Sequence, residues 1–288
     1  MKLQLINKQI KFLIVGLGLI GGSYAKALRK KGFFVSAIDK SENTIDYAIK
    51  NKIIDEGFTC VEPKAVENAD FIVFALYPDV FVKWVKDNGH LFKKGTLLTD
   101  VTGVKSCIVD EIQSLLPQGV EFIAAHPMAG REVYGVENCD DKIFEGANYI
   151  VVPTDKNTAE AIEACKDLGK ILGFSRVSEL SPTEHDEMIG FVSQLTHCIA
   201  VCLMTCSENE HLVSYTGDSF RDLTRIARIN ENMWSELFML NKEPLVKQMK
   251  VFIQECSAVK DMIENGDTES LKEKMRLSTK RRALFDKN

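Results

Sequence analysis

The chain has 288 residues, enough for a sizeable core and for two domains. Its apolar and charged fractions, 45% and 27%, are those of a globular protein, and a net charge of −5 excludes the basic surface that nucleic acids and anionic membranes attract. The first residues lack the small-residue cleavage site of a signal peptide, and no stretch reaches the roughly 18 apolar residues of a spanning helix. We therefore expect a cytoplasmic protein with no nucleic-acid or membrane partner.

Short apolar runs alternate with stretches of helical periodicity through the first half of the chain. Strands are expected at residues 11–15, 34–38, 71–76, 96–101, 121–125 and 148–152. Helices are expected at residues 21–31, 41–50, 78–88, 104–116 and 157–172. This alternation predicts βαβ units and a mainly parallel sheet. Near-continuous apolar runs such as FIVFAL are typical of strands buried on both faces.

The strand signals stop after Val177, and the rest of the chain has helical periodicity. Pro182 is expected to open the first of these helices, with Ser181 as its cap and Glu184 in its first turn. A later helix should start at Pro244. We therefore predict an α/β chain of two domains, a parallel-sheet domain over residues 1–179 and an all-α domain over residues 180–288.

A glycine-rich loop, GLGLIG at residues 16–21, joins the first predicted strand to the first predicted helix. In dinucleotide sites such glycines permit a tight turn, close approach of the pyrophosphate and close packing of helix on strand. Asp39 ends the second strand, where a carboxylate accepts hydrogen bonds from ribose hydroxyls and repels a 2′-phosphate. NAD is therefore favoured over NADP, a preference that the adjacent Lys40 could soften; the alternative is a plain turn beside an exposed aspartate. The predicted cofactor residues are Gly16, Gly18, Leu19, Ile20, Gly21 and Asp39.

His126 is the strongest candidate for a catalytic base among the five histidines. It ends an apolar run and precedes Pro127, so it should lie at the carboxyl end of a strand, facing the same crevice as the glycine loop. A neutral imidazole is the usual acceptor of a hydroxyl proton near pH 7. His90 and His211 are expected at the surface, whereas His197 is equally typical of a core histidine and of a ligand contact.

The cysteines and histidines do not predict a metal site. Cys198, Cys202 and Cys206 recur every four residues and so share one helical face, where core packing or a subunit contact is expected. The histidines and acids lack metal-ligand spacing, so we expect no metal.

The sequence resembles the prephenate/arogenate dehydrogenase family of tyrosine biosynthesis. The resemblance covers nearly the whole chain and is carried by VGLGLIGGSYAKAL, TDVTGVK, HPMAG and SFRDLTRIA. It implies a Rossmann-type domain followed by a helical domain that forms a homodimer. It also implies NAD-dependent oxidative decarboxylation of prephenate to 4-hydroxyphenylpyruvate.

Two alternatives remain open. An arogenate dehydrogenase would make tyrosine directly, and the sequence does not separate the two substrates. A non-catalytic NAD-sensing module belongs to another class, and the joint presence of His126, His197 and Arg225 argues against it.

The resemblance assigns roles to several side chains. His126 matches the catalytic histidine, which takes the proton of the ring hydroxyl as hydride leaves for the nicotinamide. Arg225 matches an arginine that binds a substrate carboxylate, although a surface salt bridge is the plain alternative. Arg221 falls on a basic residue near the substrate, and His197 on a histidine that binds substrate across the cleft. His185 matches a family histidine whose role stays open.

Three positions depart from the family pattern. Many members have a serine where this chain has Gly103, and we hypothesise that Thr102 supplies the missing hydroxyl to the histidine or the substrate. Gln194 replaces the first histidine of S-H-L-P-H, so only His197 is kept. Arg131 adds a cation near the cleft, where a small hydroxyl residue is common.

Overall fold

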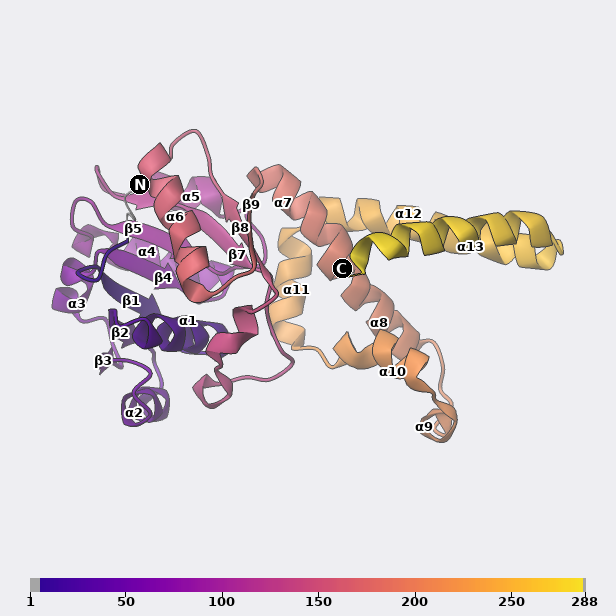
Figure 1. Cartoon of the computed structure of the whole chain (residues 1–288), viewed down its shortest axis with the longest axis horizontal. Helices are drawn as coiled ribbons and strands as arrows, with labels where there is room; N and C mark the ends of the chain where they lie inside the picture. The colour runs from indigo at the N-terminus through magenta and orange to yellow at the C-terminus, as the bar shows by residue number, and fades with distance from the viewer. Residues whose placement is uncertain (1–5, 287–288) are drawn as a thin grey trace.

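The computed structural model describes residues 6–286, so the outermost ends of the two predicted domains, residues 1–5 and 287–288, lie outside the described residues. Figure 1 shows an α/β part followed by a helical part, from which a long hairpin of two helices projects away from the sheet. The predicted fold class, a Rossmann-type domain followed by a helical domain, is confirmed.

The main sheet has six parallel strands in the order β3-β2-β1-β4-β5-β6. Its strands are β1 (Lys11–Val15), β2 (Phe34–Ile38), β3 (Glu56–Phe58), β4 (Phe71–Phe74), β5 (Leu97–Asp100) and β6 (Glu121–Phe122). The order reverses between β1 and β4, and the crevice at such a switch point is where ligands bind in open α/β sheets. The sequence did not predict β3, which is three residues long.

Helices cover both faces of the sheet. They are α1 (Leu19–Lys30), α2 (Glu42–Lys50), α3 (Pro63–Asn68), α4 (Pro78–Asn88), α5 (Val109–Leu115) and α6 (Ala159–Leu172). Phe12 and Ile14 of β1 belong to the core under α1, α2 and α6, whereas Leu13 and Val15 belong to the core under α3, α4 and α5. Because alternate residues of β1 enter opposite cores, the strand is apolar along its whole length.

The predicted strand at 121–125 divides into two strands that belong to different sheets. The second sheet contains β7 (Ala124–Pro127), β8 (Asn148–Val152) and β9 (Arg176–Glu179). β7 pairs with β8 antiparallel, and β8 pairs with β9 parallel. β7 still follows the edge of β5, because the Ile123 N–H donates to the Leu98 carbonyl at 2.9 Å and the Ala125 N–H donates to Asp100 at 3.1 Å. This contact keeps His126 at the carboxyl end of the main sheet.

The helical part begins after β9. Its helices are α7 (Pro182–Ile189), α8 (Thr196–Thr205), α9 (Leu212–Tyr215), α10 (Asp218–Thr224), α11 (Glu231–Leu240), α12 (Lys242–Glu264) and α13 (Thr268–Arg282). The predicted cap is confirmed: the Ser181 hydroxyl accepts from the Glu184 N–H, and the Glu184 carboxylate accepts from the Ser181 N–H. Pro244 lies in the first turn of α12, two residues after the helix begins. α7 continues into α8 through a π-helical turn, Gly190–Leu195.

One helical run corrects the expectation that no stretch is apolar enough to span a membrane. Pro182–Thr205 meets that criterion by length and composition, with a mean hydropathy of 1.6 over its most apolar window. Core helices of globular proteins meet the same criterion, so the finding is weak evidence for a membrane. Only 28% of this window is buried within the chain.

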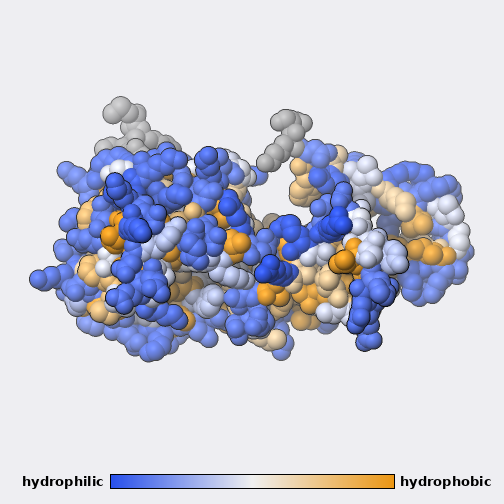
Figure 2. Space-filling view, turned by 90° about the horizontal axis from the view of Figure 1, so that it is seen from below, coloured by the Kyte–Doolittle hydropathy of each residue, from blue (hydrophilic) through white to orange (hydrophobic). Residues whose placement is uncertain are grey.

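The exposed side of this run carries several apolar side chains. Met188, Phe191, Val192 and Met204 are exposed, and we call these four residues the apolar face. The cysteine stripe is half-buried at Cys198 and exposed at Cys202 and Cys206, so it is not part of the chain's buried core, and the subunit contact remains a prediction. Figure 2 shows hydrophobic surface gathered on the helical part.

Candidate active site

A cleft of about 620 Å³ lies between the α/β part and the helical part. Its lining includes the glycine loop, His126 and the loop that follows it, and residues of α8 and α11. The structure thus brings together the predicted cofactor loop and the predicted base.

The geometry of the loop requires glycine at the positions predicted for the tight turn and for close packing of the helix. Gly16 has φ +95°, and a Cβ there would lie 2.5 Å from the Ala75 carbonyl oxygen. A Cβ at Gly21 would lie 1.9 Å from the Gly16 carbonyl oxygen, so only glycine lets α1 approach the loop this closely. At Gly18 no described atom lies within 4 Å of the Cβ position, which leaves room for a ligand. The N-terminus of α1 has no side-chain cap and no acidic residue, so its N–H groups remain available for an anion.

Asp39 is held at the end of β2 by the loop itself. One carboxylate oxygen accepts from the Leu17 N–H at 2.8 Å, and the other accepts from the Ser41 N–H at 2.9 Å. Asp39 and Gly16 support the loop, while its residues 18–21 line the cleft. Lys40 is exposed.

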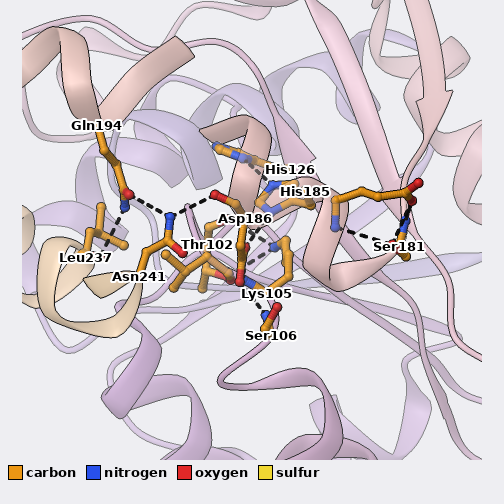
Figure 3. A network of polar contacts seen from close by, with 12 residues as sticks. Thr102, Lys105, Ser106, His126, Ser181, His185, Asp186, Gln194, Leu237 and Asn241 are labelled. Atoms are coloured by element: carbon orange, nitrogen blue, oxygen red, sulfur yellow. Dashed lines mark hydrogen bonds and ion pairs between the residues drawn. The ribbon is translucent and has the colours of Figure 1, made fainter. Parts of the chain in front are cut away.

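His126 is the first member of a hydrogen-bonded chain that leads away from the cleft (Figure 3). Its Nδ1 lies 2.9 Å from Nε2 of His185, whose Nδ1 lies 2.7 Å from Asp186 Oδ1. An ionised carboxylate only accepts, so Nδ1 of His185 carries a proton and its Nε2 accepts from Nδ1–H of His126. The Nε2 of His126 is therefore left as a free acceptor on a ring that lines the cleft.

The surroundings keep both imidazoles neutral near pH 7. Burial holds the pKa of His126 well below its usual value, and His185 and Lys105 lower it further. Burial also lowers the pKa of His185, although Asp186 opposes the shift. Burial alone would raise the pKa of Asp186, but hydrogen bonds from His185 and the Ser106 backbone outweigh it, so the net pKa is lowered and Asp186 is ionised. A neutral His126 beside the cofactor loop is able to accept a proton.

A buried ion pair fixes the backbone behind His126. Lys105 and Asp100 are both fully buried, with their charged atoms 2.6 Å apart. The Lys105 ammonium also donates to the carbonyls of Ala125, at 2.7 Å, and Thr102, at 3.0 Å. The residue before His126 is thereby tied to the end of β5.

The structure does not give Thr102 the role of helper to His126. Its hydroxyl contacts the Asp100 carboxylate, the Val104 carbonyl at 2.9 Å and the Lys105 ammonium at 3.1 Å. Thr102 is among the cleft residues, yet its hydroxyl is occupied by these buried partners. The side chain that orients His126 is His185, whose role the sequence left open.

His197 and Trp234 form the opposite wall of the cleft. Nδ1 of His197 donates to the Ser193 carbonyl at 2.9 Å, which leaves Nε2 as an acceptor. The imidazole stacks on the Trp234 indole, with ring centroids 3.7 Å apart and an interplanar angle of 30°. Burial lowers the pKa of His197, so this ring is neutral near pH 7. Of the two readings of His197, the cleft position favours the ligand contact; no sequence signal singled out Trp234.

Gln194, which replaces a family histidine, has a structural task. It is 1% exposed, its amide oxygen accepts from Asn241 at 2.7 Å, and its amide nitrogen donates to the Leu237 carbonyl at 3.1 Å. Asn241 also donates to the Asp186 carbonyl at 2.9 Å, so these amides join α7 to the start of α12 (Figure 3).

The predicted substrate arginines are engaged elsewhere in this structure. Arg225 lies outside the cleft lining and forms an ion pair with Glu132, at 2.6 Å, in the loop after β7. Arg221 pairs with Asp218 at 3.5 Å within α10 and is also outside the lining.

Two other arginines line the cleft. Arg131 pairs with Asp140 at 3.1 Å. Arg228, which sequence reasoning missed, has no ion-pair partner among the described residues. Its position three residues after Arg225 was the available signal. The described residues contain no group of three or more side chains suited to a metal ion.

Comparison with known proteins identifies the family. The chain matches the nucleotide-binding domain of prephenate dehydrogenase over residues 24–175 and the prephenate dehydrogenase dimerization domain over residues 181–277. It is 32% identical over 267 residues to the prephenate dehydrogenase of Bacillus subtilis (strain 168), which covers 90% of this chain and 71% of that relative.

Solved structures agree with this assignment. The prephenate dehydrogenase of Aquifex aeolicus, solved in complex with hydroxyphenyl propionate and NAD+, has a TM-score of 0.87 at 31% identity and covers 96% of this chain and 98% of that chain. The Synechocystis arogenate dehydrogenase shares the fold, with a TM-score of 0.82 at 21% identity over 96% of this chain and all of that chain. The chain belongs to the prephenate dehydrogenase family.

Proposed function

We propose that this protein is an NAD-dependent prephenate dehydrogenase, which oxidises the ring carbinol of prephenate and releases the ring carboxylate as CO₂ to give 4-hydroxyphenylpyruvate. The observation that carries the proposal is a neutral His126 with a free Nε2 in the same cleft as a dinucleotide-binding loop. Family membership supports an oxidoreductase over the alternative of an NAD-sensing module.

The residues at the glycine loop fit NAD. The open position at Gly18 and the uncapped N-terminus of α1 suit a pyrophosphate, and Asp39, at the end of β2, is proposed to accept from the ribose hydroxyls. The Aquifex aeolicus relative was solved with NAD+. When bound, NAD accepts the hydride that leaves the substrate ring.

The chain's own residues position the substrate and move one proton. Nε2 of His126 accepts the proton of the ring hydroxyl as the carbinol carbon is oxidised. His197 and the face of Trp234 bind the ring from the opposite wall. Arg228 provides an unpaired guanidinium for a carboxylate, and Arg225 is able to bind a second one if substrate displaces Glu132. Arg221 is proposed as a more distant cation.

The cleft cations Arg131 and Arg228 suit the two carboxylates that prephenate and arogenate share. Arogenate differs by an ammonium group where prephenate has a keto group, so relative rates with the two substrates distinguish them.

The dimer and the location are also proposals. The apolar face requires a partner, and the matched C-terminal family is described as a dimerization domain, so we propose a homodimer through the helical part. We also propose a cytoplasmic location, because all eight cysteines are free thiols, as expected in a reducing compartment.

Initial rates with prephenate and arogenate, each with NAD and NADP, test the proposed function. We expect the highest kcat/KM for prephenate with NAD. Turnover of neither substrate would contradict the proposal, and a clear preference for arogenate would move the assignment to the second member of the family.

A further inference from the structure

His185 presents a second base directly behind the first. Its Nε2 accepts from Nδ1–H of His126 at 2.9 Å, while its Nδ1 faces Asp186 at 2.7 Å. His185 is fully buried and Asp186 is 3% exposed. A proton can therefore reside on either of two imidazoles, and only the imidazole of His185 has a carboxylate beside it.

We propose that the proton taken from the substrate does not stay on His126 but is passed to His185, where it is held as an ion pair with Asp186. The inference rests on the proposed function, since it concerns the substrate proton. It makes His185 a proton acceptor that acts through His126, and Asp186 the counter-ion of that acceptor.

The charges around the two rings favour a proton on His185 over a proton on His126. Lys105 faces both rings, but its charge is compensated by Asp100 at 2.6 Å in a fully buried pair. Among the described residues, Asp186 forms no ion pair with a lysine or arginine side chain; its hydrogen-bond partners include His185 and the N–H groups of Lys105 and Ser106. The thiol of Cys107, whose pKa burial raises to about 11, stays neutral. One buried carboxylate is therefore uncompensated until a proton enters the chain.

The proposed transfer balances without any further reactant. The O–H bond of the substrate breaks and an Nε2–H bond forms on His126. At the same time the Nδ1–H bond of His126 breaks and an Nε2–H bond forms on His185. His126 ends neutral with its proton on Nε2, and His185 ends cationic beside Asp186. The reverse path returns the proton to the cleft after the product leaves.

The plainer alternative is that His185 only orients His126. His185→Gln separates the two roles, because its amide oxygen can accept from Nδ1–H of His126 but cannot bind a proton at pH 7. If His185 takes the proton, we expect kcat in this variant to fall by about 10-fold or more, within the range of a lost proton-transfer group, with KM and NAD affinity kept. The acid limb of the pH–kcat/KM profile should also move to lower pH, since an imidazolium on His126 loses its route to Asp186. His211→Gln, at an exposed histidine, is the matched control.

A spectroscopic test needs neither cofactor nor turnover. In wild-type protein labelled with ¹⁵N-histidine, the signals of the two rings are assigned with His185→Gln and His126→Asn and followed as the pH is lowered. We expect the first proton to convert His185 to imidazolium while His126 stays neutral with its proton on Nε2.

The outcomes separate this inference from the proposed function. Protonation of His126 before His185, or wild-type kcat and pH profile in His185→Gln, would overturn the relay. If wild-type protein failed to oxidise prephenate, the proposed function would fall, whereas the NMR titration would still report where the proton resides. If His185→Gln did not fold, as judged by its thermal melt, the wild-type titration would decide alone. The His126 signals would be assigned from His126→Asn, and those of His185 by elimination after single substitutions of His90, His197 and His211.

Discussion

At the scale of single residues, the site depends on which nitrogen atoms are already occupied. His126 has a free Nε2 because His185 accepts from its other nitrogen, and His197 has a free Nε2 because Ser193 accepts from its Nδ1. The two walls of the cleft therefore present neutral acceptors, and the charged contacts are left to the arginines.

Replacing the base removes the proton acceptor without disturbing the cofactor loop. In His126→Asn we expect turnover to fall by roughly 10²-fold or more, as for a lost general base. NAD affinity, measured by calorimetry, should be kept, because the glycine loop is a separate contact. Steady-state kinetics beside a His211→Asn control checks this. Near-normal turnover in His126→Asn would contradict a role for His126 as the base.

The pH dependence follows from the lowered pKa values of the hydrogen-bonded His126–His185 pair. The pair without an added proton is the active form, so activity is present above the pKa of the pair and lost as pH falls through it. Because burial lowers the pKa of both histidines, the acid limb of kcat/KM for wild-type enzyme should have its midpoint below about 6.5, the usual value for histidine. A midpoint above that value would mean that another group controls the acid limb.

Arg228 is expected to bind a substrate carboxylate. Charged hydrogen bonds contribute about 1.5–3 kcal/mol, so Arg228→Gln should raise the KM for prephenate by roughly 10-fold or more with a smaller effect on kcat. Arg221→Gln, which removes an exposed arginine outside the cleft lining, is the control. Equal effects of the two substitutions would argue for general electrostatic attraction instead of a specific contact.

At the scale of elements, the sequence predicted those whose pattern is strong and local. The boundaries of β1, β2, β8 and α4 match the expected ranges. The division of the run at 121–125 was not predictable, because both halves are apolar and the change of sheet depends on distant partners of Ala125. Three-residue β3 and six-residue α3 are too short to show a period.

The glycine loop separates a folding requirement from a binding requirement. In Gly21→Ala the new methyl would overlap the Gly16 carbonyl, so both the melting temperature and the affinity for NAD should fall. In Gly18→Ala the methyl meets open space, so only NAD affinity should fall. Thermal melts and calorimetric titration with NAD distinguish the two. A lowered melting temperature for Gly18→Ala would contradict this division of roles.

At the scale of the whole molecule, the site is assembled from both parts of the chain. His126 and His185 are 59 residues apart, and Glu132 and Arg225 are 93 apart. The sequence indicated His126, His197 and the glycine loop because each has a local motif or a family match. It did not indicate the His126–His185 contact, the Glu132–Arg225 pair or Trp234, because these follow from how the helical part packs on the sheet.

The apolar face is expected to be the dimer contact. Placing a charge on it should disrupt the dimer, so Phe191→Glu is expected to sediment as a monomer at concentrations where wild-type protein is a dimer. Ile49→Glu, which alters an exposed apolar residue on α2, should leave the dimer intact. Sedimentation velocity checks both, and an unchanged dimer in Phe191→Glu would move the interface elsewhere.

The π-helical turn between α7 and α8 sets the rotational phase of the two helical histidines. His197 lies twelve positions after His185, and at about 100° per residue a regular α-helix would leave them roughly 120° apart around its axis. A π-turn absorbs about one residue, which reduces that offset to roughly 20°. The extra residue of the π-helical turn thus allows one continuous helical run, α7 to α8, to place His185 against His126 and His197 against Trp234. Losing that residue would preserve the helix and uncouple the two walls of the site.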